Sequence, residues 1–468
     1  MSDDLTIEGN KFHFIGIGGV GMSGLARICA AQGGIVSGSD IKESRFTEQL
    51  EKNWIDVEYG HRAENVPDGD VIVVVSTAIQ DDNPELICAK NRGLTIIHRA
   101  QMLELLGKNL KTLAVAGTHG KTTTSSMLAC TLDDMGQDPT FVIGGMVLQY
   151  DTNARPGTGD FYVVEADESD KSLTCIKPYA AIVTSIESDH LDHYNSINEI
   201  YDKFAQFFQS LQDSAPCVVS AEDEKLVTLA KNNANNVITY GFSESADVRI
   251  ISSERLGVGS AFSIKFPDGR VVNSKITRNP GSHNELNACA VLTLIDALGL
   301  DVADAARKLS NFEGVHRRFE LVGRTKGITV IDDYAHHPTE IAATIKAAKA
   351  LDFKCIHVIF QPHRYSRYHL MCEMLKDEFA HAFDLADTLI FTDVYAAGET
   401  PTPGVNGQTF LNTIINNGGK PKCMYVPRLV DVPEAVKGIA SSGDLIMTMG
   451  AGDITGIGTH ILESIKRA

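Results

Sequence analysis

The sequence has no excess of basic residues and no long apolar run. Its 468 residues include 42 Lys and Arg against 60 Asp and Glu, a formal net charge of −18. Proteins whose main partner is a nucleic acid concentrate Lys and Arg, so this balance argues against such a partner. The longest aliphatic run, residues 71–75, is far shorter than the roughly 20 apolar residues that a membrane-spanning helix needs. We therefore expect no nucleic-acid partner and no membrane insertion.

The sequence also has no metal-binding or disulfide pattern of cysteines and no targeting segment. Its nine cysteines are dispersed and never spaced CxxC, which argues against both a zinc cage and a disulfide framework. The first residues, MSDDLTIEGN, have neither the basic start nor the apolar stretch of a signal peptide. Together these absences predict a cytoplasmic protein.

What the sequence does contain is the alternation typical of α/β proteins. Short β-branched runs alternate with helical patterns, which predicts βαβ units with parallel sheets. One helical pattern ends near Gly107 before a new strand, and a third cycle of strands and helices starts at GITVIDDY, beyond Phe319. We therefore predict three domains, residues 1–107, 108–319 and 320–468. Within the central domain, residues 260–276 alternate around a Pro-Asp-Gly turn, which predicts a hairpin.

Residues 111–124, KTLAVAGTHGKTTT, predict a phosphate-binding loop between a strand and a helix. In such a loop the glycines expose backbone N–H groups, the lysine meets the terminal phosphates and the next hydroxyl binds magnesium. Gly117, Gly120, Lys121 and Thr122 fill these places, although Ala114 stands where the general pattern has glycine. The alternative is a plain strand-to-helix turn.

Residues 12–21, FHFIGIGGVG, place Gly16, Gly18 and Gly21 directly after an apolar strand pattern. Such a GxGxxG loop lets a pyrophosphate approach the backbone, and an acid further along can bind a ribose. Asp40, 24 residues after Gly16, is the candidate acid. The motif favours dinucleotide or sugar-nucleotide binding over a structural turn, and both NAD and a UDP-sugar fit it.

Polar side chains follow several later strands. Glu165 ends the strand of FYVVEADESD and His190 follows the strand of AAIVTSIESDHLDHY, where acids can hold a nucleotide-bound Mg²⁺. Histidine is a less usual ligand for Mg²⁺, and a solvated acidic loop is the alternative. Asn284, beside His283, could bind a ligand or cap a helix.

Arginines and histidines gather near the second boundary and beyond it. Arg317 and Arg318 of GVHRRFE could be solvated, or one could reach a phosphate held by another domain. In a doubly wound domain, the loops IDDYAHHPTE and FQPHRYSR would open at the same sheet edge. Their polar residues are Asp332, Asp333, Tyr334, His336, His337, His363, Arg364 and Arg367.

The chain resembles the Mur ligases, the ATP-dependent amide-forming enzymes of bacterial cell-wall precursor synthesis, over nearly its whole length. The segments that carry the resemblance are FIGIGGVGMSGLA, GTHGKTTT, EADESD, SIESDHLD, NPGSHNELNA, GVHRRFE, DDYAHHPTE and FQPHRYSR. The resemblance implies a Rossmann-like N-terminal domain for UDP-N-acetylmuramate, a central P-loop domain for ATP and a C-terminal Rossmann-like domain. It favours the branch that adds L-alanine through an acyl phosphate, releasing ADP and phosphate, over the branch that recycles a tripeptide.

The resemblance also implies the following site residues. The UDP-sugar set is Gly16, Gly18, Gly19, Val20, Gly21, Asp40, Ser76 and Thr77. The ATP set is Gly117, Thr118, His119, Gly120, Lys121, Thr122, Thr123, His283, Asn284, Arg318 and Asp333. The L-alanine set is Tyr334, His336, His363, Arg364 and Arg367, and the Mg²⁺ set is Thr122, Glu165 and His190. The catalytic set is Lys121, Glu165, His190, Arg318 and His336.

Lys203 lies near, but not clearly in, the register of a carbamylated lysine found in several Mur ligases, so no metal role is predicted for it. We expect the domains to close around the substrates, because Lys121 and Arg318 must meet on one phosphate. We expect a monomer or a homodimer. Two other classes remain as alternatives, an NAD-dependent oxidoreductase and a non-catalytic nucleotide-switched regulator.

Overall fold

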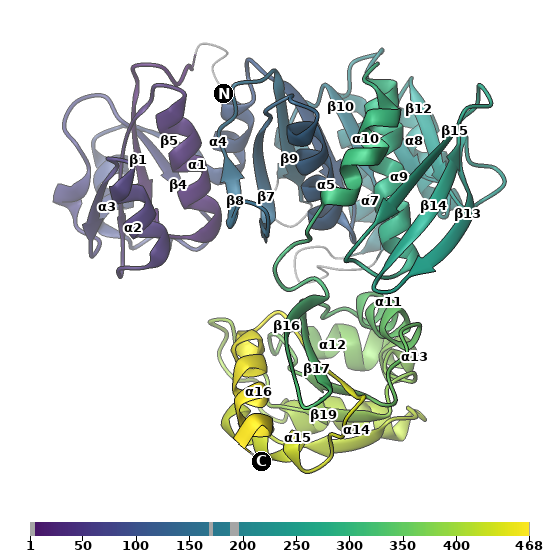
Figure 1. The fold of residues 1–468 in the computed structure, drawn as a ribbon. Helices are drawn as coiled ribbons and strands as arrows, with labels where there is room; N and C mark the ends of the chain where they lie inside the picture. Colours follow the sequence, from purple (N-terminus) through teal and green to yellow (C-terminus); the bar gives the residue numbers. More distant parts are fainter. Residues whose placement is uncertain (1–4, 168–171, 188–195, 468) are drawn as a thin grey trace.

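The computed structural model describes residues 5–167, 172–187 and 196–467 of the chain. They form three α/β parts, each built on its own sheet (Figure 1). No helix among these described residues is long and apolar enough to cross a bilayer. The predicted α/β class with three successive parts is confirmed.

The N-terminal part is a parallel five-stranded sheet in the order β3-β2-β1-β4-β5, the order of a doubly wound fold without its sixth strand. Its strands are β1 Lys11–Ile15, β2 Ile35–Asp40, β3 Asp56–Tyr59, β4 Ile72–Val75 and β5 Thr95–His98. Its helices are α1 Val20–Ala31, α2 Arg45–Lys52, α3 Pro84–Asn91 and α4 Arg99–Leu106. Strand β1 is buried from Phe12 to Ile15, so the glycine loop that follows leaves from the middle of the sheet.

The central part is a ten-stranded sheet in the order β15-β14-β13-β12-β11-β10-β6-β9-β7-β8. Its strands are β6 Lys111–Ala116, β7 Thr140–Val147, β8 Thr152–Arg155, β9 Phe161–Ala166, β10 Ala180–Val183, β11 Cys217–Ser220, β12 Val237–Gly241, β13 Val248–Leu256, β14 Gly259–Lys265 and β15 Val271–Ile276. Its helices are α5 Lys121–Asp134, α6 Ser172–Cys175, α7 Ile197–Ser210, α8 Glu224–Asn233, α9 Ser282–Ala297 and α10 Val302–Lys308.

The middle of this sheet is parallel and both of its edges are antiparallel. Strands β14 and β15 form the predicted hairpin, and the long strand β13 joins it to the parallel strands. Helices α5 and α9 are buried almost all round because they pack against each other as well as against the sheet.

The C-terminal part is a six-stranded sheet in the order β16-β17-β21-β18-β19-β20. Its strands are β16 Glu320–Thr325, β17 Ile328–Asp333, β18 Ile356–Phe360, β19 Thr388–Phe391, β20 Lys422–Tyr425 and β21 Leu445–Met449. Its helices are α11 Pro338–Lys349, α12 Arg367–His369, α13 Lys376–His381, α14 Gly407–Asn416, α15 Val432–Lys437 and α16 Ile457–Arg467. The third cycle expected from residue 327 has an additional strand before it, because β16 pairs antiparallel with β17 at the edge.

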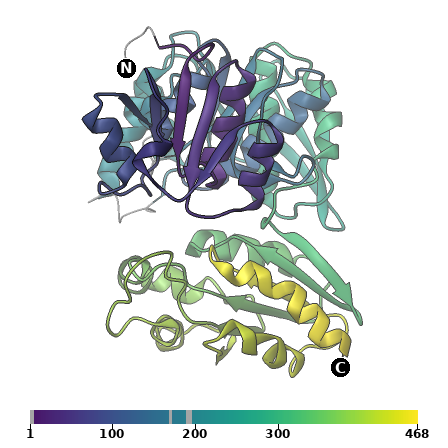
Figure 2. The same cartoon turned by 90° about the vertical axis from the view of Figure 1, so that its left-hand side faces the viewer.

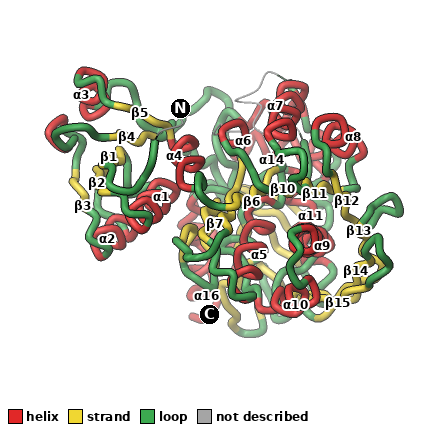
Figure 3. Tube along the Cα trace, turned by 90° about the horizontal axis from the view of Figure 1, so that it is seen from above, coloured by secondary structure: helices red, strands yellow, loops and turns green. Residues whose placement is uncertain are grey.

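The N-terminal and central parts lie side by side, and the C-terminal part lies against the end of the central part where the loop after β6 emerges (Figures 1 and 2). Seen from above, helices α1 and α4 lie between the first sheet and the central one (Figure 3). This arrangement brings loops from all three parts towards a common region.

Candidate active site

The loop between β6 and α5 has the backbone of a phosphate-binding loop. Gly117 and Gly120 have φ angles of 126° and 81°, values that favour glycine. A Cβ atom would lie 2.2 Å from Thr184 Oγ1 at Gly117 and 2.8 Å from Asn287 Oδ1 at Gly120. The loop then leads into the N-terminus of α5, and the N-terminus of a helix favours an anion.

Lys121 is the buried cation of this loop, with 8% of its surface exposed. Its Nζ atom donates to the carbonyl oxygens of Gly117, at 2.6 Å, and Thr118, at 3.3 Å. The same atom lies 3.2 Å from Asp167 Oδ2 beyond the end of β9. These contacts hold the ammonium group at the mouth of the loop, where a terminal phosphate would lie.

Glu165 is the next-to-last residue of strand β9, next to β6 in the sheet, and faces the start of α5. Its carboxylate accepts hydrogen bonds from Thr122 Oγ1 at 3.2 Å, Ser125 Oγ at 2.9 Å and Gly144 N at 2.8 Å. Burial raises the pKa of the Glu165 carboxyl, although the hydrogen bonds from Gly144 and Ser125 act in the opposite direction. A carboxylate and a hydroxyl side by side form a donor set that suits Mg²⁺. His190, the third predicted ligand, lies outside the described residues.

A cavity of about 380 Å³ opens beside the P-loop. Its lining brings together most of the predicted ATP residues from three segments: His119, Gly120, Thr123, His283, Asn284, Arg318 and Asp333. Burial raises the pKa of the Asp333 carboxyl to about 6, and this carboxylate accepts hydrogen bonds from the backbone of Phe319 and Ala335.

The start of helix α9 forms one wall of this nucleotide cavity. Gly281 is the N-cap of α9, so the alternative that Asn284 caps the helix is wrong. Asn284 Nδ2 instead donates to Pro280 O and His283 Nε2, both at 3.0 Å. Burial, together with the charge of Arg318, lowers the pKa of His283 to about 4, so its ring is neutral at pH 7.

Asn287 is a cavity residue that the sequence reasoning missed. It lines the nucleotide cavity, and its Nδ2 atom donates to Asn284 Oδ1 at 3.3 Å. The three-residue spacing of the two asparagines places them on one face of α9, and this spacing was the signal available in the sequence.

A second cavity, of about 560 Å³, also borders the P-loop. It joins Lys121, Thr122 and Glu165 to the residues predicted for L-alanine, namely Tyr334, His336, His363, Arg364 and Arg367. Val20 of α1 also lines it. Lys121 and Arg318, expected to meet on one phosphate, both line this cavity.

The arginine-rich wall of the second cavity is built around aromatic rings. The guanidinium groups of Arg317 and Arg318 lie 4.9 Å and 5.2 Å from the centre of the Tyr334 ring. His363 stacks on Tyr395, with ring centres 5.7 Å apart. Burial, followed by the charges of Arg367 and Arg364, lowers the pKa of His363 to about 4. Because His363 is neutral, the arginines supply the positive charge of this wall, which suits a carboxylate.

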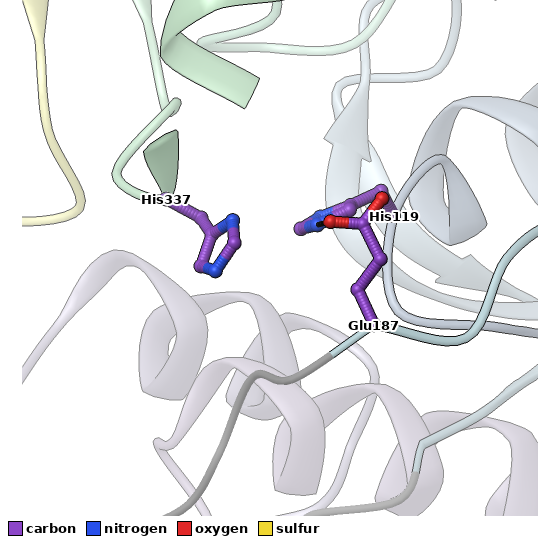
Figure 4. A group of neighbouring side chains, drawn as sticks. All are labelled: His119, Glu187 and His337. Atoms are coloured by element: carbon purple, nitrogen blue, oxygen red, sulfur yellow. Dashed lines mark ion pairs between the residues drawn. The ribbon is translucent and has the colours of Figure 1, made fainter. Parts of the chain in front are cut away.

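His119, Glu187 and His337 lie close together at the boundary between the central and C-terminal parts (Figure 4). His119 Nε2 lies 3.4 Å from Glu187 Oε2, and His119 Nδ1 lies 3.3 Å from Glu340 Oε1. Burial lowers the pKa of His119, but these two carboxylates outweigh it and raise the pKa to about 10. These contacts form an ion-pair cluster between the central and C-terminal parts.

The glycine loop of the N-terminal part is held by β2. Gly16 N and Ile17 N donate to Ser39 O at 2.8 and 2.9 Å, and Gly18 N donates to Asp40 Oδ2 at 2.9 Å. The Asp40 carboxylate therefore holds the glycine loop in place. Gly19 is the N-cap of α1, which begins at Val20 and continues through Gly21. Ser76 and Thr77 follow β4 at the same edge of the sheet as this loop.

The fold and these cavities define a class of three-domain nucleotide-binding enzyme, in which a P-loop domain lies between a glycine-loop domain and an arginine-rich domain. The chain belongs to the Mur ligase family. Three family models match it: "Mur ligase family, catalytic domain" over residues 11–110, "Mur ligase middle domain" over residues 115–295 and "Mur ligase, glutamate ligase domain" over residues 317–452.

Within this ATP-dependent family, the chain is similar over its full length to ligases that act on UDP-N-acetylmuramate and L-alanine. A UDP-N-acetylmuramate–L-alanine ligase of Solidesulfovibrio magneticus is 41% identical over 461 residues, covering 98% of this chain and 99% of its own. The enzyme of that name from Pelobacter propionicus is 42% identical, covering 98% of each chain. The crystal structure of UDP-N-acetylmuramate-alanine ligase from Thermotoga maritima has a TM-score of 0.79 and 31% identity, covering 98% of this chain and 99% of its own. A murein peptide ligase from Psychrobacter arcticus has a TM-score of 0.69 and 25% identity, with the same coverage.

Proposed function

We propose that this chain joins L-alanine to the carboxylate of UDP-N-acetylmuramate in a reaction that converts ATP to ADP and phosphate, a step of peptidoglycan precursor biosynthesis. The observation that carries this proposal is the 560 Å³ cavity, which is lined both by Lys121 and Thr122 of the P-loop and by Arg364 and Arg367. A phosphate site and a carboxylate site in one cavity suit a reaction between a phosphorylated acid and an amino acid. The full-length relatives named as UDP-N-acetylmuramate–L-alanine ligases support this proposal.

The first chemical step forms an acyl phosphate. An oxygen of the muramyl carboxylate attacks the γ-phosphorus of ATP, the bond to the β,γ-bridging oxygen breaks, and ADP leaves. Lys121 and the N-terminus of α5 hold the phosphates, and Arg318, which lines both cavities, stabilises the transferring charge. Thr122 and Glu165 would hold Mg²⁺, with His190 as a further ligand, and the ion would neutralise phosphate charge.

The second step forms the amide. The amine of L-alanine loses a proton and attacks the carbonyl carbon, and inorganic phosphate leaves from the tetrahedral intermediate. Arg364 and Arg367 would bind the carboxylate of L-alanine in the wall that contains neutral His363. His336 lies in the same cavity, with Nδ1 3.3 Å from Glu340 Oε2, so it is oriented where the amine would approach.

The nucleotide cavity accounts for the rest of ATP. We propose that His283, Asn284 and Asn287 contact adenine and that Asp333 contacts the ribose, because all four line the cavity of about 380 Å³ beside Gly120. The N-terminal glycine loop, with Ser76 and Thr77 at the same sheet edge, would hold the UDP group on the N-terminus of α1. We further propose a cytoplasmic monomer or homodimer.

The test is the mass of the product after incubation with ATP, Mg²⁺, UDP-N-acetylmuramate and a panel of amino acids. We expect UDP-N-acetylmuramoyl-L-alanine and an equal amount of ADP. Product formation with a tripeptide but not with L-alanine would instead assign the recycling activity. A Lys121→Ala variant is the control for contaminating ligases and should form no product.

A further inference from the structure

A single amide group connects the N-terminal glycine loop to the proposed metal site. Asn153 lies on strand β8 and is 2% exposed. Its Nδ2 atom donates to Val20 O, at 3.2 Å, and to Ile143 O, at 3.4 Å. Both neighbours are carbonyl oxygens, so only the amide nitrogen can occupy this position, and both of its hydrogens are used.

The two carbonyls belong to the two half-sites of the proposed reaction. Val20 is the first residue of α1, whose N-terminus we assign to the UDP group, and it also lines the 560 Å³ cavity. Ile143 on β7 directly precedes Gly144, whose N–H donates to Glu165 at 2.8 Å. Asn153 is therefore one hydrogen bond from each half-site.

Helix α1 also contacts strand β8 through close packing and side-chain hydrogen bonds (Figure 1). A Cβ atom on Gly24 would lie 2.5 Å from the Cβ of Ala154, so the helix lies directly on the strand. Arg27 Nη2 donates to Thr152 Oγ1 at 2.7 Å and to Ala154 O at 2.9 Å. Residues 20, 24 and 27 fall on one face of α1, and the whole face is used for docking.

The energetic cost at Asn153 indicates a role beyond packing. Among the described residues, none donates a hydrogen bond to Asn153 Oδ1, although this atom is buried. An unpaired buried acceptor destabilises the fold, so a residue selected for packing alone would be apolar. The Nδ2 atom of the same amide donates to Val20 O and Ile143 O, and these two hydrogen bonds fix the position of α1 relative to β7.

We propose that Asn153 is a positioning residue, which holds the start of α1 in register with Glu165 so that the muramyl carboxylate reaches the γ-phosphate. This inference rests on the proposed function, because it assigns the UDP group to α1 and the phosphate to the P-loop. In-line attack needs reacting atoms about 3–3.5 Å apart, and a misplacement of about 1 Å can lower the rate by about 100-fold. The contact between α1 and β8 therefore sets the rate of acyl-phosphate formation and leaves the separate binding of each substrate intact.

The test compares variants of the full-length enzyme in kcat and in the Kd for UDP-N-acetylmuramate and for a non-hydrolysable ATP analogue. Asn153→Ala and Gly24→Ala should each lower kcat by about tenfold or more, while both Kd values stay within about threefold of wild type. The double variant Gly24→Ala with Ala154→Gly moves the methyl group to the other side of the contact and should recover most of the lost kcat. Asn406→Ala removes the N-cap of α14 in the C-terminal part and should leave kcat unchanged.

The outcomes separate the inference from its premise. If wild-type enzyme forms no UDP-N-acetylmuramoyl-L-alanine, the proposed function fails before any variant is compared. If wild type is active, the inference is overturned by an Asn153→Ala variant with wild-type kcat, or by one whose affinity for the UDP-sugar falls as much as its kcat. Failure of the double variant to recover kcat, with its melting temperature near that of wild type, also overturns it.

Discussion

His119 of the P-loop and Glu340 of helix α11 lie 3.3 Å apart, from Nδ1 to Oε1, although 221 residues separate them in the chain. The Glu340 carboxylate also lies 3.3 Å from His336 Nδ1 and 3.8 Å from Arg318 Nη1. These charged neighbours outweigh burial and lower the pKa of Glu340 well below its usual value. One partly buried carboxylate thus contacts residues of the proposed ATP site and the proposed alanine site.

Replacing Glu340 with Gln keeps the side-chain shape and removes its charge. We expect kcat to fall by about tenfold or more, because the partly buried His119 and Arg318 lose their charged partner across the domain boundary. The radius of gyration without ligands, measured by solution X-ray scattering, should increase. Glu373→Gln is the matched control, because Glu373 pairs with His369 on an exposed surface of the same domain. A Glu340→Gln enzyme with wild-type kcat and unchanged scattering would contradict this assignment.

The proposed Mg²⁺ ligands can be tested through the hydroxyl of Thr122, which lies 3.2 Å from Glu165 Oε2. Thr122→Val has a similar volume but offers the ion no oxygen. The Mg²⁺ concentration for half-maximal activity should rise by about tenfold or more, and a metal chelator should abolish wild-type activity. Ser126→Ala, whose hydroxyl donates only to Thr122 O, is the control. An unchanged Mg²⁺ requirement would show that Thr122 is not a ligand.

The sequence predicted the parts of the site that depend on local spacing. The P-loop and the glycine loop follow buried strands and precede helices, so the motif and its setting are readable within about one βα unit. Glu165 was predicted for a related reason, because a parallel strand beside the P-loop strand ends at the same edge of the sheet.

The parts that the sequence did not predict depend on contacts between distant segments. Strand β16 is half-exposed and irregularly paired, so its hydrophobic pattern is weak. Glu340 looks like an ordinary first-turn acid of α11, and only domain packing reveals its contact with His119. Asn284 resembles an N-cap because asparagine is common at that position. The helix in fact begins after Gly281, whose φ of 106° cannot be predicted from the residue types around it.

Acid should weaken the N-terminal part through Glu85, which is fully buried. Its carboxylate lies 2.9 Å from His13 Nε2 and accepts hydrogen bonds from Ser39 Oγ at 2.7 Å and Asn65 Nδ2 at 2.9 Å. Burial raises its pKa, but these partners outweigh burial and lower the pKa from 4.5 to about 2. The ionised carboxylate therefore stabilises the fold above pH 4.5, and this contribution is lost as the pH falls through about 2.

The ionised Glu85 carboxylate contributes on the order of 3 kcal/mol to the free energy of unfolding at pH 7, and less at pH 3. Glu85→Gln should consequently lower the free energy of unfolding more at pH 7 than at pH 3. Urea denaturation at both pH values measures the difference. Glu64→Gln, at an exposed position nearby, should change neither value. Equal losses at the two pH values would mean that the charge of Glu85 does not matter to the fold.

The carboxylate of L-alanine should be bound by Arg364 and Arg367 in the arginine-rich wall of the second cavity. Arg364→Lys and Arg367→Lys keep the positive charge but lose the planar fork that binds a carboxylate through two hydrogen bonds. Since a hydrogen bond to a charged group contributes about 1.5–3 kcal/mol, the KM for L-alanine should rise by about 10- to 100-fold. The KM values for ATP and UDP-N-acetylmuramate should stay within about threefold of wild type. Arg428→Lys, which alters an exposed pair with Asp431, is the control. If the KM for ATP rises instead, these arginines contact phosphate, and the amino acid must enter the cavity from the side of Tyr334 and His336.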